Sequence, residues 1–401
     1  MDGRNDQSDL ESPEFLRMSL AAAMTLGVKP GVFYRNARLY CINLLLTYRN
    51  GCAARCAYCG LSRNRPGIYQ GKSFIRVAWP TYALDEIIQR IGERREKVKR
   101  ICISMITNKR SIHDTNEVCA RLRSSFDIPV SLLISPTILG YKDLLDFRHA
   151  GADKIGVAID LATEALFDRY RGRGVQGPHR WNTYWRTLKD ALDVFGKGNA
   201  GAHFMVGMGE TEKEMCEAIQ RVRDMGGSTH LFSFFPEAGS VMADCMPPPL
   251  DQYRRIQLAR YLIDNGISRG DRFGYDERGR IANFGLPRDD LNRIIDSGQP
   301  FRTSGCEGYD GEVACNRPFA NSRPGPEMRN YPFPPNRADI QRIRRQMEGK
   351  DALLSFELER ATACRHGQSK KGSRWNIHFR FRALSIFCRT GQCPRLLHRP
   401  L

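Results

Sequence analysis

The sequence predicts an α/β fold, a partial, TIM-like (βα)6 barrel with a C-terminal extension. Apolar runs of strand length alternate with helical patterns, which is typical of parallel α/β sheets. This alternation repeats six times between about residues 36 and 265, and the 401 residues are enough to bury a substantial core. The functional site of such a barrel is expected where the carboxyl ends of its strands meet.

The six predicted strands are short apolar runs. They cover 38–46, 101–106, 129–134, 154–159, 202–206 and 230–235. Helices are expected between them, because apolar residues recur there at positions i, i+3, i+4 and i+7, as they do at 84, 87, 88 and 91. Thr211 and Glu214 form a capping-box pair, which fixes the start of the helix after the fifth strand.

Composition divides the chain into four regions. We expect an N-terminal helical extension over residues 1–35, the barrel over 36–300, a cysteine-containing extension over 301–345 and a basic tail over 346–401. The tail is predicted to be disordered, because residues 360–401 carry ten Lys or Arg and no Asp or Glu, a pattern typical of a solvated arm. A nucleic-acid contact and an out-of-frame extension are the alternative interpretations, but no RNA-binding signature accompanies the basic residues.

The cysteine content indicates a reducing compartment and metal chemistry. Thirteen cysteines occur without a secretory signal, since the first fourteen residues carry five acidic side chains. No apolar run reaches the length of a membrane span. We therefore expect a cytoplasmic protein without a membrane contact, whose net charge of +18 suits acidic partners.

Cys52, Cys56 and Cys59 are the most informative residues of the chain. They follow the first predicted strand at a spacing that lets three thiolates bind three irons of a [4Fe-4S] cube and leaves the fourth iron open. An open iron can hold a small chelating molecule and transfer an electron to it. A structural zinc site is the alternative, but it needs a fourth Cys or His nearby, and residues 60–100 contain neither. Cys41 lies within a predicted strand and is interpreted as a buried strand residue.

With Tyr58 immediately before the last cysteine, this motif resembles the signature of the radical S-adenosylmethionine (SAM) superfamily. The resemblance implies a [4Fe-4S] cluster held by the three cysteines, and a SAM molecule whose amino and carboxylate groups chelate the open iron. Reductive cleavage of SAM would then give a 5′-deoxyadenosyl radical, which abstracts hydrogen from unactivated carbon. The electron would come from a reductant such as ferredoxin or flavodoxin.

Further SAM contacts follow from the same resemblance. The candidate SAM-site residues are Tyr58, Asp160, Val206, Gly207 and Glu210. Residues 206–210 match the motif whose backbone flanks the adenine, and Asp160 ends the fourth strand, where an acidic residue often contacts SAM. The alternatives are an ordinary capped turn at 206–210 and helix capping by Asp160 before residues 162–170. Many family members have a Gly-Gly-Glu run after the second strand, where this chain has Thr107 and Asn108.

The order of features from residue 36 to 334 resembles the biotin synthase and lipoyl synthase branch of this superfamily. Biotin synthases bind a second cluster through cysteines on three strands, of which Cys102 matches one and the other two are missing. Residues 74–80, 303–306 and 314–325 look like the corresponding segments of the two-protein (bipartite) lipoyl synthases, in which two radical SAM polypeptides act together.

Sulfur insertion by such an enzyme requires a sulfur source, which an auxiliary iron-sulfur cluster can supply. Cys306 and Cys315 are the candidate ligands of that auxiliary cluster, since they lie in a glycine-rich extension able to cover the open side of the barrel. The remaining ligands stay open between Cys41, Cys102, a serine and the partner protein. Two ordinary buried cysteines are the alternative interpretation.

The resemblance thus implies one component of a lipoyl synthase, which inserts sulfur into an octanoyl chain attached to a lipoyl carrier protein or domain. Its partners would be that carrier, the second radical SAM protein and the reductant. Phe232 and Phe234, in the last predicted strand, are expected in the core. The alternatives are a mutase or cofactor-assembly enzyme that acts on an amino acid, and an RNA-binding protein that depends on its basic tail.

Overall fold

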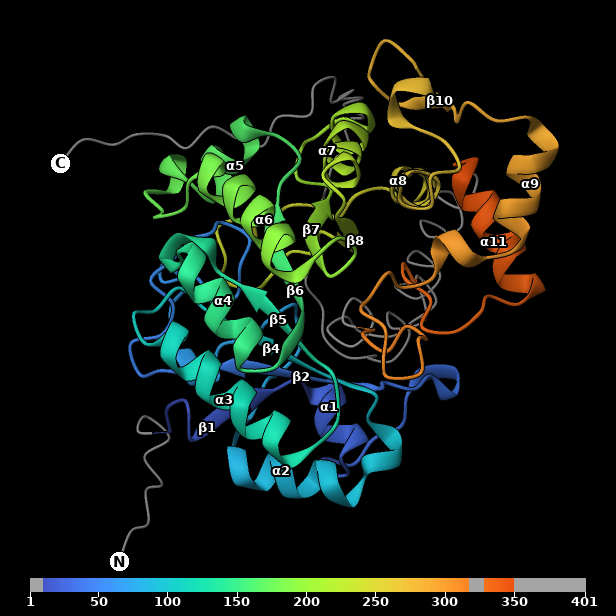
Figure 1. Ribbon diagram of the computed structural model, residues 1–401. Coiled ribbons are helices and arrows are strands. Elements are labelled where there is room, and N and C mark those ends of the chain that lie inside the picture. The colour runs from blue at the N-terminus through green and yellow to red at the C-terminus, as the bar shows by residue number, and fades with distance from the viewer. Residues whose placement is uncertain (1–9, 317–327, 350–401) are drawn as a thin grey trace, which may run out of the picture.

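The main feature of the fold is an eight-stranded sheet with the strand order β3-β1-β2-β4-β5-β6-β7-β8 (Figure 1). The computed structural model describes residues 10–316 and 328–349. The strands of this sheet are β1 (Phe15–Met18), β2 (Cys41–Leu46), β3 (Thr81–Ala83), β4 (Arg100–Ser104), β5 (Val130–Ile134), β6 (Ala152–Asp160), β7 (Ala200–Val206) and β8 (Ser228–Ser233).

Six strands, β2 and β4 to β8, run parallel to one another. They are the six strands that the sequence predicts, shifted by a few residues at their ends. Among the described residues no strand pairing joins β8 to β2, so the barrel is open on that side. The prediction of an α/β fold with a partial, TIM-like barrel is therefore confirmed.

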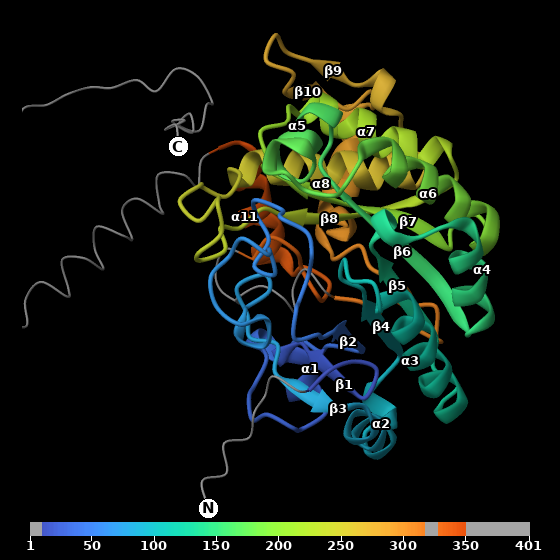
Figure 2. The same cartoon turned by 90° about the vertical axis from the view of Figure 1, so that its left-hand side faces the viewer.

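Helices follow the strands and pack against the sheet. Figure 2 shows α3, α4 and α6 side by side along β4 to β7. The helices are α1 (Leu20–Thr25), α2 (Leu84–Glu93), α3 (Ser111–Ser125), α4 (Tyr141–His149), α5 (Glu164–Tyr170), α6 (Trp181–Phe195), α7 (Glu212–Asp224), α8 (Leu250–Asp264), α9 (Arg288–Asp296) and α11 (Arg337–Met347). The predicted capping box of α7 is confirmed, because the Glu214 N–H donates to the Thr211 hydroxyl at 3.2 Å and the Thr211 N–H donates to the Glu214 carboxylate at 2.7 Å.

The N-terminal region differs from the helical extension expected over residues 1–35. Its described part contains the short helix α1, but β1 belongs to the main sheet, where it pairs antiparallel with β2 and β3. Arg17 of β1 is 1% exposed and donates to the carbonyl oxygens of Tyr69 and Trp79. β1 thereby fixes the segment that follows the cysteine motif. Its four residues are too short a pattern to predict a strand, since its pairing depends on distant parts of the chain.

Residues 301–316, which we call the base strap, cross the open side of the barrel at the amino ends of the strands. His230 of β8 donates from Nδ1 to the Ser304 carbonyl at 2.6 Å. Arg100, the first residue of β4, donates to the Glu307 carbonyl. The strap therefore links β8 to β4, and the cysteine-containing extension covers the barrel at the end opposite the cysteine motif.

A small hairpin follows α8 in the sequence. β9 (Gly274–Tyr275) and β10 (Ile281–Asn283) pair as an antiparallel hairpin in a region where the sequence suggests a short strand. The motif residues 317–327 and most of the predicted basic tail, 350–401, lie outside the described residues.

The barrel and its helices share one large cluster of buried apolar side chains. In the two described stretches of the chain, every helix is too short or too polar to cross a membrane.

Candidate functional site

The three cysteines of the motif line a cavity of about 190 Å³ at the carboxyl ends of the parallel strands. Cys52, Cys56 and Cys59 lie in the loop after β2, where the sequence places them. The opposite walls come from the ends of β4 to β8 and from the loops that follow these strands. The site thus has the position expected for a barrel of this type.

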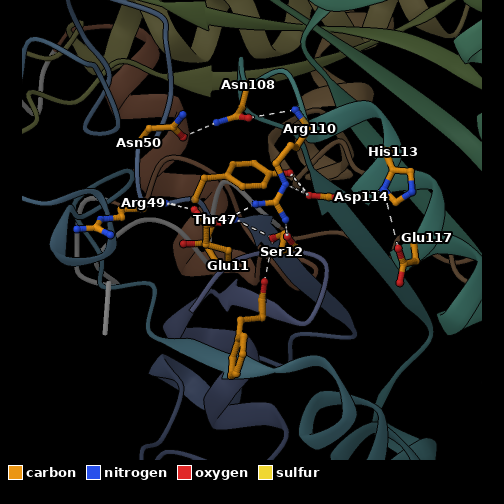
Figure 3. A network of polar contacts seen from close by, with 12 residues as sticks. Glu11, Ser12, Thr47, Arg49, Asn50, Asn108, Arg110, His113, Asp114 and Glu117 are labelled. Carbon is orange, nitrogen blue, oxygen red and sulfur yellow. Dashed lines mark hydrogen bonds and ion pairs between the residues drawn. The ribbon is translucent and has the colours of Figure 1, made fainter. Parts of the chain in front are cut away.

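A polar network holds the start of the cysteine loop (Figure 3). Glu11 accepts hydrogen bonds from the Arg49 N–H at 2.6 Å and from the Arg110 guanidinium at 2.5 Å. Asn108 donates its side-chain amide to Asn50 Oδ1 at 2.8 Å. The network therefore connects the N-terminal segment and the start of α3 to the turn that leads from β2 into the motif.

The loop is also anchored along its length by backbone hydrogen bonds. Ala53 donates to the Thr107 carbonyl and Ala57 to the Tyr170 carbonyl, both at 2.8 Å. Burial raises the pKa of the Cys56 thiol to about 12, so the free thiol keeps its proton until a metal displaces it. Three thiols that line one cavity, of which Cys56 is buried and Cys52 and Cys59 are partly buried, fit a cluster that needs three thiolate ligands.

Asp160, Tyr58 and Arg171 form a hydrogen-bonded group beside the cysteines. The Tyr58 hydroxyl donates to Asp160 Oδ2 at 2.6 Å, and Arg171 donates to the same oxygen. Asp160 has a φ of 68°, a left-handed conformation that is uncommon outside glycine. The alternative in which Asp160 caps a helix is wrong, because Thr163 caps α5 through its hydroxyl. The structure therefore brings Tyr58 and Asp160 together at the cavity, and a SAM contact by either of them stays a prediction.

Arg171 and His179 line the cavity and were not among the residues singled out from the sequence. Arg171 is 7% exposed and also donates to the Tyr184 hydroxyl at 3.1 Å. The Tyr184 hydroxyl lies 2.9 Å from His179 Nδ1. Burial, followed by the charge of Arg171, lowers the pKa of His179 well below its usual value, so this imidazole is neutral. Neither residue has a local sequence signal, because their partners lie on other strands and helices.

The side chain of Glu210 stabilises the turn after β7. Its carboxylate accepts the Gly207 N–H at 2.7 Å and the Met208 N–H at 2.8 Å. Gly207 has a φ of 100°, and a Cβ there would lie 2.5 Å from Pro248, so glycine is required. Among the described residues that line the cavity, none belongs to the 206–210 turn. The Glu210 side chain thus serves the turn itself, and an adenine contact by the Val206–Gly207 backbone stays a prediction.

Two phenylalanines at the end of β8 have different surroundings. Phe234 is fully buried, as predicted, but Phe232 lines the cavity and stacks on His203 with ring centroids 5.3 Å apart. The core assignment of Phe232 is therefore corrected, since its side chain faces the inside of the barrel. Glu237 is 3% exposed and accepts the Arg76 N–H at 2.6 Å and the Ser73 hydroxyl.

Cys306 and Cys315 lie far from the motif cysteines, at the base of the barrel. They pack there against Cys41 and Cys102, which come from β2 and β4. In the described ranges, no group of three or more His, Cys, Asp or Glu side chains has the geometry to hold a metal ion. This finding includes Cys52, Cys56 and Cys59.

Comparison with known proteins gives a family for part of the chain. Residues 46–222 match the model of the Radical SAM superfamily. No curated protein matches the sequence. Similar solved structures include methylornithine synthase (PylB), with a TM-score of 0.44 and 12% identity over 61% of this chain and 66% of that one. They also include the FeFe-hydrogenase maturase HydG of Carboxydothermus hydrogenoformans, with a TM-score of 0.45 and 15% identity over 61% of this chain and 56% of that one. The chain spans less than two thirds of the length of both.

Proposed function

Because residues 46–222 form a radical SAM superfamily domain, we propose that this protein is a radical SAM enzyme that acts as one component of a lipoyl synthase. The family carries a [4Fe-4S] cluster and SAM, and Cys52, Cys56 and Cys59 are the thiolates that would hold the cluster. When bound, this pair supplies a 5′-deoxyadenosyl radical after one-electron reduction by a ferredoxin or flavodoxin. We place the reaction in the cytoplasm, where thiols stay reduced.

In this proposal, residues beside the cysteine motif bind and orient SAM. Asp160 presents a carboxylate toward the cavity, and Tyr58 and Arg171 fix its orientation through their hydrogen bonds to Oδ2. A carboxylate held in this way can accept hydrogen bonds from the ribose hydroxyls or the ammonium group of SAM. The backbone of Val206 and Gly207 is the proposed adenine contact.

The apolar lining of the cavity is the observation that carries the choice of substrate. Beside its charged residues, the cavity is lined by many aliphatic, sulfur-containing and aromatic side chains: Leu45, Met105, Ile106, Leu133, Ile134, Met205, Phe232 and Phe235. Such a surface excludes water from a carbon radical and binds an alkyl chain better than a charged amino acid. An octanoyl chain attached to a carrier protein has this chemistry, and an acidic carrier would suit the net charge of +18.

The proposal is tested with the anaerobically reconstituted protein, the second radical SAM protein, SAM, reductant and an octanoylated carrier domain. We expect 5′-deoxyadenosine and a thiolated octanoyl group, both measured by mass spectrometry. The Cys52→Ala, Cys56→Ala, Cys59→Ala variant should form neither product. Cys216→Ala removes a buried cysteine outside the site and should form both. Formation of 5′-deoxyadenosine without any thiolated product would overturn the lipoyl synthase assignment and leave the radical SAM assignment intact.

A further inference from the structure

A separate cavity, of about 400 Å³, lies at the amino ends of β6, β7 and β8, on the side of the barrel opposite the cysteine motif. We call it the base pocket. Its walls come from the first residues of these strands, from the end of α8 and from the base strap. A cavity of this size suits a small organic molecule. It is distinct from the catalytic cavity, because the two share no lining residue.

Three basic side chains from three separate elements line the base pocket: Lys154 of β6, Arg260 of α8 and Arg302 of the base strap. Lys154 donates to the Gly198 carbonyl at 3.4 Å and to the Glu307 carboxylate at 3.5 Å. Arg302 donates to Gln299 Oε1 at 3.4 Å. These contacts are longer than the roughly 2.7 to 3.2 Å of a good N–H···O hydrogen bond, so a ligand can replace them with shorter ones.

Arg260 is the most buried of the three and has few hydrogen-bond partners. It is 8% exposed, and its Nε has no hydrogen-bond partner in the described structure. A guanidinium has five N–H groups, but Arg260 donates one hydrogen bond there, to the Pro300 carbonyl at 3.3 Å. Asp264 lies 3.8 Å away, and its carboxylate already accepts the Thr229 hydroxyl at 2.8 Å. A buried cation with so few partners is costly unless another acceptor pairs with it.

The neighbouring carboxylate does not compensate for the burial of Arg260. Burial lowers the pKa of Arg260 and raises the pKa of Asp264, and the attraction between the two charges opposes both shifts. Both pKa directions therefore agree that the loss of water outweighs an ion pair at 3.8 Å. An anion in the base pocket would stabilise the Arg260 charge that Asp264 leaves incompletely paired.

The alternative is that Arg260 serves the end of its own helix, since basic side chains often pair with the last carbonyl oxygens of a helix. In α8 these carbonyls have other donors. Those of Tyr261, Leu262 and Ile263 accept backbone N–H groups from the turn that follows the helix, at 3.1, 2.9 and 3.0 Å. Arg260 is therefore not needed as a cap, and its charge is available to a ligand.

We propose that the base pocket binds a small organic phosphate monoester through Lys154, Arg260 and Arg302. A phosphate group has three terminal oxygens, all strong acceptors, which match cations that come from a strand, a helix and the strap. A carboxylate has two oxygens, which one guanidinium satisfies alone. The rest of the pocket is bordered by neutral side chains able to bind hydroxyl groups, among them Asn199, Tyr261 and Asn265. This site does not depend on the proposed function.

A ligand at this place joins the base strap to the barrel. Lys154 and Arg260 belong to barrel elements, whereas Arg302 lies at the start of the strap. The strap is already held nearby, because the Thr303 N–H donates to the Tyr331 carbonyl at 3.0 Å. A phosphate that accepts hydrogen bonds from both sides adds a further link, so its binding stabilises the folded protein and protects the strap from opening.

The site is tested by calorimetric titration and thermal unfolding of the full-length, anaerobically reconstituted protein in a phosphate-free buffer. The probe is glycerol 3-phosphate, which should bind saturably and raise the Tm. Glycerol lacks the phosphate and should have no effect. Sodium chloride at equal ionic strength is the second control, because a net charge of +18 attracts any anion without a built site.

The Lys154→Met, Arg302→Met variant removes the two partly exposed cations and leaves the buried Arg260 in place, so the fold is not at risk. Each lost charged hydrogen bond should weaken the binding of glycerol 3-phosphate roughly tenfold or more. Cleavage of SAM should be unchanged. The matched Lys213→Met, Arg293→Met variant removes two cations whose side chains are 55% and 81% exposed and do not line the base pocket. It should bind glycerol 3-phosphate like wild type.

Two outcomes would overturn the site: a Tm rise no larger than that with sodium chloride, or wild-type affinity in the Lys154→Met, Arg302→Met variant. Hydrogen–deuterium exchange locates the ligand, since protection of residues 302–307 supports the base pocket and protection confined to other segments contradicts it. Tighter binding of citrate than of glycerol 3-phosphate would make carboxylate the recognised group and overturn the ligand class.

Discussion

The hydroxyl of Tyr58 lies 2.6 Å from Asp160 Oδ2 and joins the cysteine loop to the end of β6. This hydrogen bond orients a carboxylate at the cavity wall, although Tyr58 itself binds no iron. Under the proposed function, it would separate the positioning of SAM from the binding of the cluster, and the two effects can be measured independently.

Replacement of Tyr58 by Phe should weaken SAM binding without loss of iron. A hydrogen bond to a charged group contributes about 1.5 to 3 kcal/mol, so we expect SAM to bind roughly tenfold more weakly, or worse. Calorimetric titration of the reconstituted protein with SAM measures this effect. Tyr309→Phe makes the same change at a side chain that is 54% exposed and should leave the affinity unchanged. Loss of cluster iron in Tyr58→Phe would show that Tyr58 supports the loop instead of SAM.

Arg171→Met should destabilise the protein more than the combined change Arg171→Met, Asp160→Asn. Arg171 is 7% exposed and pairs with Asp160, so removing the guanidinium alone leaves a carboxylate without its countercharge. Breaking a buried pair in this way costs about 3 to 5 kcal/mol. Urea unfolding of iron-free wild type, both single variants and the double variant measures the coupling. Strictly additive effects of the two substitutions would contradict the pairing.

Glu210 should make stability fall as the pH rises. Burial raises the pKa of its carboxyl from 4.5 to about 7, although hydrogen bonds from the backbone N–H groups of Gly207, Met208 and Glu210 itself oppose the shift. A folded-state pKa above the unfolded one favours the folded state fully below pH 4.5, and this contribution is lost as the pH rises through 7. The loss amounts to roughly 3 kcal/mol. Glu210→Gln lacks this titration, so its unfolding free energy should approach or exceed that of wild type toward pH 8. Parallel pH profiles for the two proteins would refute the assignment.

If Cys306 and Cys315 hold the auxiliary cluster that the sequence predicts, Gly305→Ala should release that cluster and spare the one held by Cys52, Cys56 and Cys59. The added Cβ would lie 1.8 Å from the Cys315 carbonyl oxygen, so the strap has to move and displace its cysteines. We expect iron to fall to the content of the SAM motif, while SAM cleavage continues. Gly92→Ala is the matched control, because its Cβ would meet nothing nearer than 3.8 Å and alanine favours the helix α2 by about 0.5 to 1 kcal/mol. Full iron content in Gly305→Ala would contradict the role of the strap.

The barrel and the motif could be predicted from the sequence because their signals are local. Each parallel strand is an apolar run followed by a helical pattern, and Cys52, Cys56 and Cys59 lie within one loop. The Thr211 and Glu214 pair is local in the same sense. Strand β1 gave no such signal, because its four residues become a strand only through pairing with β2 and β3.

The remainder of the site depends on contacts between distant residues. Arg171 follows a short helix, and its role is visible only when β6 places Asp160 beside it. Cys41 was interpreted as a buried strand residue, which is correct for its burial but incomplete, because the register of β2 and β4 turns it toward Cys102. A cysteine at the start of each of two neighbouring strands was the available signal. Phe232 was assigned to the core because the sequence alone does not tell the inside of a barrel from the layer beneath its helices.

Cys41, Cys102, Cys306 and Cys315, which pack together at the base of the barrel, span the chain from residue 41 to residue 315, whereas the motif cysteines occur within eight consecutive residues. During synthesis the motif loop emerges from the ribosome early and complete, long before the strap exists. Under the proposed function, the cluster of the motif could be loaded on a partly folded chain, whereas an auxiliary cluster at Cys306 and Cys315 could be loaded only after residue 315 has been made and the strap has docked. Under the proposed function, maturation would therefore have a fixed order, and a chain that ends before the strap would split SAM without delivering sulfur.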